Sequence, residues 1–201
     1  MPVQLGAPAQ ANFEEPLKLL QDCHRRIEHF LEVLQRVVEV SSDGTLGDEA
    51  RRALKMALHY FREAAPRHTM DEEESLFPRL RQCGGEAARA ALARVAALEA
   101  DHVRADARHH EVDAIGMRWL ELGRLSQAQR SALKQHLDEL QKLYAGHLKV
   151  EDCDIFPLAG KSLSGEQMAA IGQEMKARRA AILRHEGDPS NLPSYAGGQA
   201  E

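Results

Sequence analysis

Hydrophobic residues recur at intervals of three and four along most of the chain, which is the spacing of one face of an α-helix. Turn-forming residues separate the stretches, and Pro66 lies inside the second, where it should kink the helix or end one segment. A shorter fifth stretch follows Ser164. This pattern predicts an all-α fold, an up-down-up-down four-helix bundle with a short fifth C-terminal helix. The four long stretches are residues 17–38, 54–76, 92–120 and 133–155.

The two ends of the chain lack this periodicity. Residues 1–12 are rich in Pro, Gly, Gln and Ala, and residues 186–201 are rich in Gly, Pro and Ser. We therefore expect flexible tails at 1–12 and 186–201 around one domain at 13–185. No secretory signal and no run of about 18 apolar residues is present, which predicts a cytoplasmic protein without a membrane span.

Composition and charge exclude further classes of protein. The chain has 201 residues, with 26 Lys and Arg against 31 Asp and Glu, and a formal net charge of -5. A nucleic-acid-binding domain should carry a basic patch, so no nucleic-acid partner is expected. Three cysteines do not make a disulfide scaffold. Ten histidines are more than packing of such a chain requires.

Some of these histidines belong to an internal repeat. His68 and Glu72, followed by a Phe-Pro pair, recur 79 residues later as His147 and Glu151, again followed by Phe-Pro. A single histidine precedes each copy by a similar distance, His24 in the first and His102 in the second. All six side chains interrupt apolar stripes, so they should point into the bundle.

The spacing has a chemical consequence. Residues four apart lie on the same face of a helix, about 5–6 Å from each other. The repeat predicts two helical hairpins, each with a single histidine on its first helix and the His-x3-Glu pair on its second. Antiparallel packing of these two hairpins would bring four histidines and two glutamates to one level, where both carboxylates could bridge two metal ions. Imidazole together with carboxylate suits iron, and also manganese or zinc. A single His-x3-Glu pair is common on charged helices, whereas two copies with the same ending are a specific signal.

This constellation resembles the hemerythrin-like HHE cation-binding family, over roughly residues 15–182. The resemblance implies a four-helix bundle with a non-haem centre of two iron ions joined by an oxo or hydroxo bridge. It rests on Asp22-Cys23-His24, on Asp101-His102, and on residues 72–78, 151–157 and 164–179. The matching ligand positions are His24, His68, Glu72, His102, His147 and Glu151.

One position separates this chain from the oxygen-carrying members of that family. Those members have a fifth histidine one turn after the third-helix histidine, where this chain has Asp106. We expect Asp106 to be an exposed residue and not a ligand. A four-His, two-Glu set resembles bacterial proteins that repair iron centres after nitrosative or oxidative stress, but those carry an extra N-terminal domain for which this chain has no room.

Three functions stay open at this point. The first is a di-iron protein that binds O2, nitric oxide or peroxide in sensing, storage or stress defence. The second is a di-iron peroxidase, nitric oxide reductase or iron-centre repair protein. The third is a metal-dependent regulatory interaction module. The sequence does not decide whether the protein is an enzyme, and it identifies no protein partner.

Other candidate residues receive simpler interpretations. Tyr144 lies one turn before His147 and is either a donor to a bridging ligand or a core residue. His109 and His110 lie about two turns beyond His102, where they could line an access channel, but we expect them on a solvated face. Cys23 and Cys153 are expected to be free thiols that point away from the site. Surface positions are expected for His29, His59, His136 and His185. Asp22 and Asp101 could orient an imidazole, but we expect a helix N-terminal or surface role for both.

Overall fold

The computed structural model describes residues 13–84 and 86–186, with only the helical backbone described at 86–92 and 181–186. The predicted tails lie outside the described residues, apart from Glu186, which ends the last helix. The prediction for His185 falls on a side chain that is likewise outside the described part. Among the described residues, no helix combines the length and the apolar character needed to cross a membrane.

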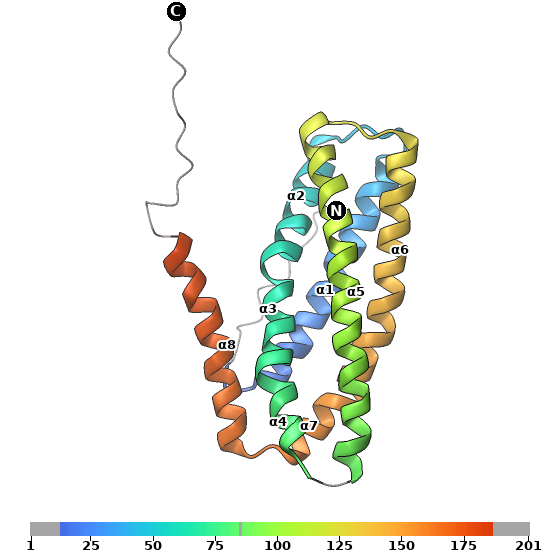
Figure 1. The fold of residues 1–201 in the computed structure, drawn as a ribbon. Coiled ribbons are helices and arrows are strands. Elements are labelled where there is room, and N and C mark those ends of the chain that lie inside the picture. Colours follow the sequence, from blue (N-terminus) through green and yellow to red (C-terminus); the bar gives the residue numbers. More distant parts are fainter. Residues whose placement is uncertain (1–12, 85, 187–201) are drawn as a thin grey trace, which may run out of the picture.

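The described chain is an all-helical bundle, as the hydrophobic pattern predicts (Figure 1). Four long segments form a ring: α1 packs against α2 and α6, and α5 packs against the same two helices. The elements are α1 (Pro16–Val40), α2 (Asp48–Glu63), α3 (Ala65–Met70), the π-helical turn η1 (Asp71–Leu76), α4 (Phe77–Gln82), α5 (Glu86–Leu122), α6 (Gln127–Val150), the π-helical turn η2 (Glu151–Ile155), α7 (Phe156–Ser162) and α8 (Gly165–Glu186).

Two predicted long helices are interrupted at corresponding places. Pro66 starts a new segment, α3, as its position in the pattern predicts. Further along, each segment widens into a π-helical turn just before its Phe-Pro pair. Phe77 N–H bonds to the carbonyl of Glu72, and Phe156 N–H bonds to that of Glu151, five residues back in both cases. Proline lacks an N–H and its ring clashes with the carbonyl four residues earlier, so a wider turn accommodates it.

The hydrophobic core is divided into two clusters along the bundle axis. One cluster contains Ile27 and Ala105, and the other contains Leu20 and Leu98. On α1 and on α5, the predicted site histidine lies between residues of the two clusters. The polar site therefore separates the two halves of the core.

At one end of the bundle, the loop between α1 and α2 contacts the loop between α5 and α6. Gly44 and Gly123 both have positive φ angles, of 85° and 69°. Trp119 Nε1 donates a hydrogen bond of 2.9 Å to the carbonyl of Gly44, and Thr45 pairs with Arg124 in an isolated antiparallel bridge. A side chain at position 44 would collide with the carbonyl of Leu125, so glycine is required there.

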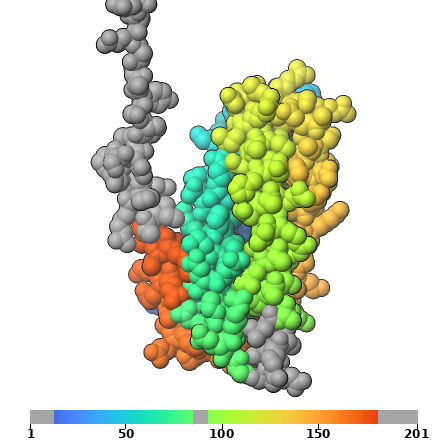
Figure 2. Space-filling view, viewed as in Figure 1, coloured from blue at the N-terminus to red at the C-terminus, as the bar shows by residue number. Residues whose placement is uncertain are grey.

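Helix α8 lies outside the ring and packs against η1 and α1 (Figure 2). Its contact with η1 is an ionic one. Asp71, which is completely buried, accepts from Arg178 at 2.8 Å and from Arg179 at 2.7 Å. Arg79 binds Glu174 through two hydrogen bonds of 3.0 and 2.7 Å. The π-helical turn that begins at Asp71 is thus attached to α8.

Candidate metal centre

The structure brings together all six residues that the repeat singles out. They come from α1, α3, η1, α5, α6 and η2, and all of them are buried, the two glutamates completely. The six are His24, His68, Glu72, His102, His147 and Glu151.

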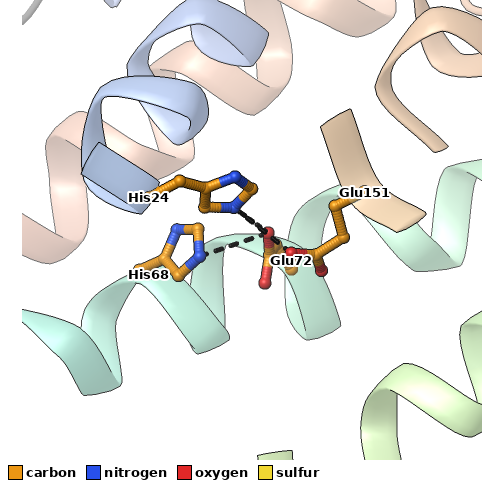
Figure 3. Close-up of side chains that lie close together, drawn as sticks. All are labelled: His24, His68, Glu72 and Glu151. Atoms are coloured by element: carbon orange, nitrogen blue, oxygen red, sulfur yellow. Dashed lines mark ion pairs between the residues drawn. The ribbon is translucent and has the colours of Figure 1, made fainter. Parts of the chain in front are cut away.

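Four of these side chains form a first group (Figure 3). One potential ligand atom from each lies within 4.8 Å of the others. His24 Nε2 is 3.2 Å from Glu151 Oε2 and 3.8 Å from Glu72 Oε1, and His68 Nε2 is 3.4 Å from the same Glu72 oxygen. Two histidines and two carboxylates therefore face one point.

The second group shares both carboxylates with the first. It consists of Glu72, His102, His147 and Glu151, again within 4.8 Å of one another. His102 Nε2 is 3.4 Å from Glu72 Oε2, and His147 Nε2 is 3.3 Å from Glu151 Oε2. Glu72 thus faces His24 and His68 with Oε1 and His102 with Oε2, which is the arrangement of a carboxylate that bridges two cations.

Six of the atoms that face the centre lack hydrogen-bond partners, whereas His102 Nε2 and His147 Nε2 lie 3.1 Å from each other. Nε2 of His24, Nε2 of His68 and all four carboxylate oxygens of Glu72 and Glu151 are buried and accept or donate no hydrogen bond among the described residues. Buried carboxylates without partners are costly, and a bound cation is what compensates them. Nitrogen and carboxylate oxygen donors suit iron, manganese and zinc, so the residues present fit a two-metal site.

Without a cation, protons would compensate the two carboxylates. Burial alone would lower the pKa of His24, but close contact with Glu151 and Glu72 outweighs it and raises that pKa to about 10. Burial acts in the same way on His102, whose contact with Glu72 raises its pKa to about 9. Burial would raise the pKa of Glu72, yet His68 and the other imidazoles lower it. Metal ions and protons must therefore compete for this site.

In two of the histidines, the ring nitrogen that faces away from the centre contacts a carboxylate. Each of these carboxylates belongs to the residue that directly follows a site glutamate. His24 Nδ1 lies 3.0 Å from Asp152 Oδ1, and His102 Nδ1 lies 2.8 Å from Glu73 Oε1. Both contacts join the two hairpins: His24 in the first contacts Asp152 in the second, and His102 in the second contacts Glu73 in the first. An acceptor at Nδ1 keeps the proton there and leaves Nε2 free for the centre.

The other two histidines have outer partners of different chemistry. His147 Nδ1 forms no hydrogen bond among the described residues but lies 3.5 Å from Asp101 Oδ2, whereas His68 lies beside the buried thiol of Cys23. Burial would raise the pKa of Cys23, but His68 and Arg26 lower it, and Arg26 donates to Cys23 Sγ at 3.0 Å.

These contacts correct two expectations from the sequence. Cys23 does not point away from the site, and Asp101 is an outer partner of a site histidine. Both residues directly precede the single histidines His24 and His102. This shared position in the repeat is the signal that could have found them.

The comparison with known proteins agrees with this arrangement. The chain matches the family described as the hemerythrin HHE cation binding domain over residues 15–159. It belongs to that family. All six clustered residues lie within the matched part of this hemerythrin HHE chain. An uncharacterized protein of Haemophilus influenzae is 26% identical over 179 residues, which cover 88% of this chain and 98% of that protein.

The position of the missing fifth histidine is occupied by an exposed residue in this hemerythrin HHE domain. Asp106 is exposed, as expected, and lies 3.5 Å from His110 Nδ1 on the next turn of α5. His110 is exposed as well.

His109 contradicts the expectation of a solvated face. Its ring stacks on Phe61 with centroids 4.3 Å apart, and its Nε2 lies 3.0 Å from the hydroxyl of Tyr144. Half-buried His109 lies between the buried residues Ala105 and Val112 on one face of α5.

The remaining sequence expectations have mixed outcomes. Cys153 is exposed, and so are His29 and His59. His136 is only partly exposed, and its Nδ1 is buried. Asp22 is partly buried and pairs with Arg25 at 2.5 Å.

Proposed function

We propose that this hemerythrin HHE chain holds two non-haem iron ions with its four histidines and two glutamates, and that the centre binds a small ligand such as O2, nitric oxide or peroxide. One observation carries the proposal: two groups of four side chains share the carboxylates of Glu72 and Glu151, whose oxygens have no hydrogen-bond partner in the described part of the chain. Each iron would receive two imidazoles and one oxygen from each glutamate.

The number of protein ligands leaves room for this chemistry. With two imidazoles and two carboxylate oxygens to hold it, and an oxo or hydroxo group shared with its neighbour, each ion would have five donors. An exchangeable position would then remain on each ion, because Asp106 faces solvent instead of closing it. Bound iron would supply the coordination positions and the electrons for reaction with such a ligand.

The proposal extends to the organisation of the protein. Residues 13–185 would act as one domain, with four long segments that alternate in direction, in the cytoplasm. Sensing, storage or stress defence are the roles that fit a centre of this kind.

A second candidate is a di-iron peroxidase or nitric oxide reductase. The exposed position of Asp106 favours it, because two open metal positions permit a reaction across both ions. Steady-state turnover of peroxide or nitric oxide with a reductant would support this candidate. Stoichiometric binding without turnover would support the binding protein instead.

Anaerobic reconstitution with ferrous iron tests the proposed function. We expect about two iron ions per chain and, after exposure to air, near-ultraviolet absorption from an oxo-bridged ferric pair. Fewer than about one iron per chain, or zinc or manganese retained in preference to iron, would contradict the proposal.

A further inference from the structure

A hollow of about 350 Å³ lies beside the candidate metal centre. His102, one of the six clustered residues, lines it together with its outer partner Glu73. His109 and Tyr144 line the same hollow. The remaining wall consists of Thr69, Asp106 and six apolar residues: Phe61, Ala65, Pro66, Met70, Val103 and Ala105. A small molecule that reaches the centre by this route therefore meets both apolar and polar side chains.

Two of those polar groups form a fixed pair. Tyr144 is buried, and its hydroxyl lies 3.0 Å from His109 Nε2. The tyrosine ring also lies edge-on to the ring of His147, with centroids 6.2 Å apart. Stacking on Phe61 holds the other side of the pair. The pair thus extends from the wall of the hollow to a histidine of the centre.

The protonation state of His109 decides whether its Nε2 or the hydroxyl of Tyr144 is the donor in their hydrogen bond. Burial, and then the neighbouring His110, lower the pKa of His109 to about 4, so its ring is neutral near pH 7. Its Nδ1 is buried without a hydrogen-bond partner among the described residues. An unpaired N–H there would cost more than an unpaired lone pair, which favours the proton on Nε2. His109 then donates to the Tyr144 oxygen, and the Tyr144 O–H remains free to donate elsewhere.

We propose that this hollow admits the small ligand of the metal centre and that Tyr144, oriented by His109, donates a hydrogen bond to that ligand. This inference rests on the proposed function and adds two residues outside the six-residue cluster. Metal-bound dioxygen, nitric oxide and peroxide share the ability to accept such a hydrogen bond. Tyr144 is the ligand-contacting residue in this account, and His109 is a positioning residue.

Azide binding to the iron-loaded, oxidised full chain tests the role of Tyr144. Azide is a small anion that binds ferric iron and accepts hydrogen bonds. Tyr144→Phe removes only the hydroxyl, and we expect it to weaken azide binding about 10-fold, as for loss of a hydrogen bond to a charged group. Tyr60→Phe is the matched control, because Tyr60 is not among the residues that line the hollow and its hydroxyl donates instead to the backbone carbonyl of Cys23, at 3.4 Å. It should bind azide as the wild type does.

A second pair of variants tests the positioning role of His109. His109→Phe preserves the stacked ring but removes the donor to Tyr144, and we expect azide binding to weaken about threefold, a smaller loss because the Tyr144 hydroxyl remains. His110→Phe makes the same change at the exposed neighbour and should have no effect. Iron content should equal that of the wild type in all four variants, which separates ligand binding from metal binding.

A vibrational measurement gives a signature that a purely structural role would not produce. The stretching frequency of bound azide should shift between H2O and D2O in the wild type and in Tyr60→Phe, but not in Tyr144→Phe. Equal azide affinity and an equal isotope shift in Tyr144→Phe and Tyr60→Phe would overturn this inference while leaving the metal centre intact. Failure of the wild type to hold iron would instead contradict the proposed function.

Discussion

At the scale of single residues, the four histidines differ in what holds the ring nitrogen that faces away from the centre. Three of these nitrogens lie near a carboxylate, from Asp152, Glu73 or Asp101, whereas His68 lies beside the thiol of Cys23. A carboxylate partner makes an imidazole a stronger ligand than a thiol does. The two metal positions should therefore be inequivalent, although the repeat makes their inner ligands the same.

Mössbauer spectroscopy of the iron-loaded protein checks this inequivalence. We expect two quadrupole doublets of different splitting in the wild type. Cys23→Asp gives His68 a carboxylate neighbour and should bring the two doublets closer together. A single doublet in the wild type, or a spectrum that Cys23→Asp does not change, would show that the thiol has no influence on the centre.

Removal of inner residues should abolish metal binding. His68→Ala and Glu151→Ala each delete an atom that faces the centre, and we expect iron retention to fall from about two ions per chain to below one. His136→Ala is the control, because His136 lies outside the cluster. Equal iron content in all three variants, measured after gel filtration, would mean that the ligand assignment is wrong.

At the scale of elements, the spacing of residues predicted most of the fold but not its local irregularities. The four long helical segments and the clustering of His24 with His102 follow from an apolar period near 3.6 and from the repeat. The π-helical turns do not, because a count of residues four apart assumes uniform α-helical geometry. The contacts of His109 with Phe61 and Tyr144 were not predicted, because residue spacing shows which positions share a helix face but not which side chains of α2 and α6 they meet. Cys23 could be placed beside His68 only once the packing of α1 on α3 was known.

The contact between α8 and the first π-helical turn can be tested by a single change. Arg178→Ala removes one of two partners of the buried Asp71, next to Glu72, and we expect a loss of about 2 kcal/mol in the free energy of unfolding. Iron retention should fall as well, because the turn that carries Glu72 loosens. Denaturant unfolding of the metal-free variant measures the first effect.

The matched control for this change is an exposed arginine on another helix. Arg118→Ala, on α5, should alter stability by about 0.5 kcal/mol or less. Similar losses in both variants would indicate that the α8 contact has no special role.

At the scale of the whole molecule, the polar centre divides the core and makes stability depend on pH and metal together. In the metal-free protein, the raised pKa values of His24 and His102, about 10 and 9, contribute stability below the unfolded value near 6.5. That contribution is lost as the pH rises through 9 to 10. The lowered pKa of Glu72 contributes stability above about 4.3 that is lost as the pH falls.

Thermal denaturation across pH 5–9, with and without iron, measures this coupling. Metal ligation needs neutral imidazoles and ionised carboxylates, so the stabilisation by iron should grow as the pH rises and shrink as it falls. The metal-free protein alone should lose stability from about pH 6.5 upward. Parallel curves for the two forms would contradict competition between protons and metal at this centre.

The most direct test of the central claim is an anomalous diffraction measurement at the iron absorption edge, on crystals of the reconstituted protein. The account predicts two iron peaks roughly 3.5–4 Å apart, one between His24 and His68 and one between His102 and His147, with Glu72 and Glu151 reaching both. A single peak, no peak, or iron bound away from these six residues would contradict it.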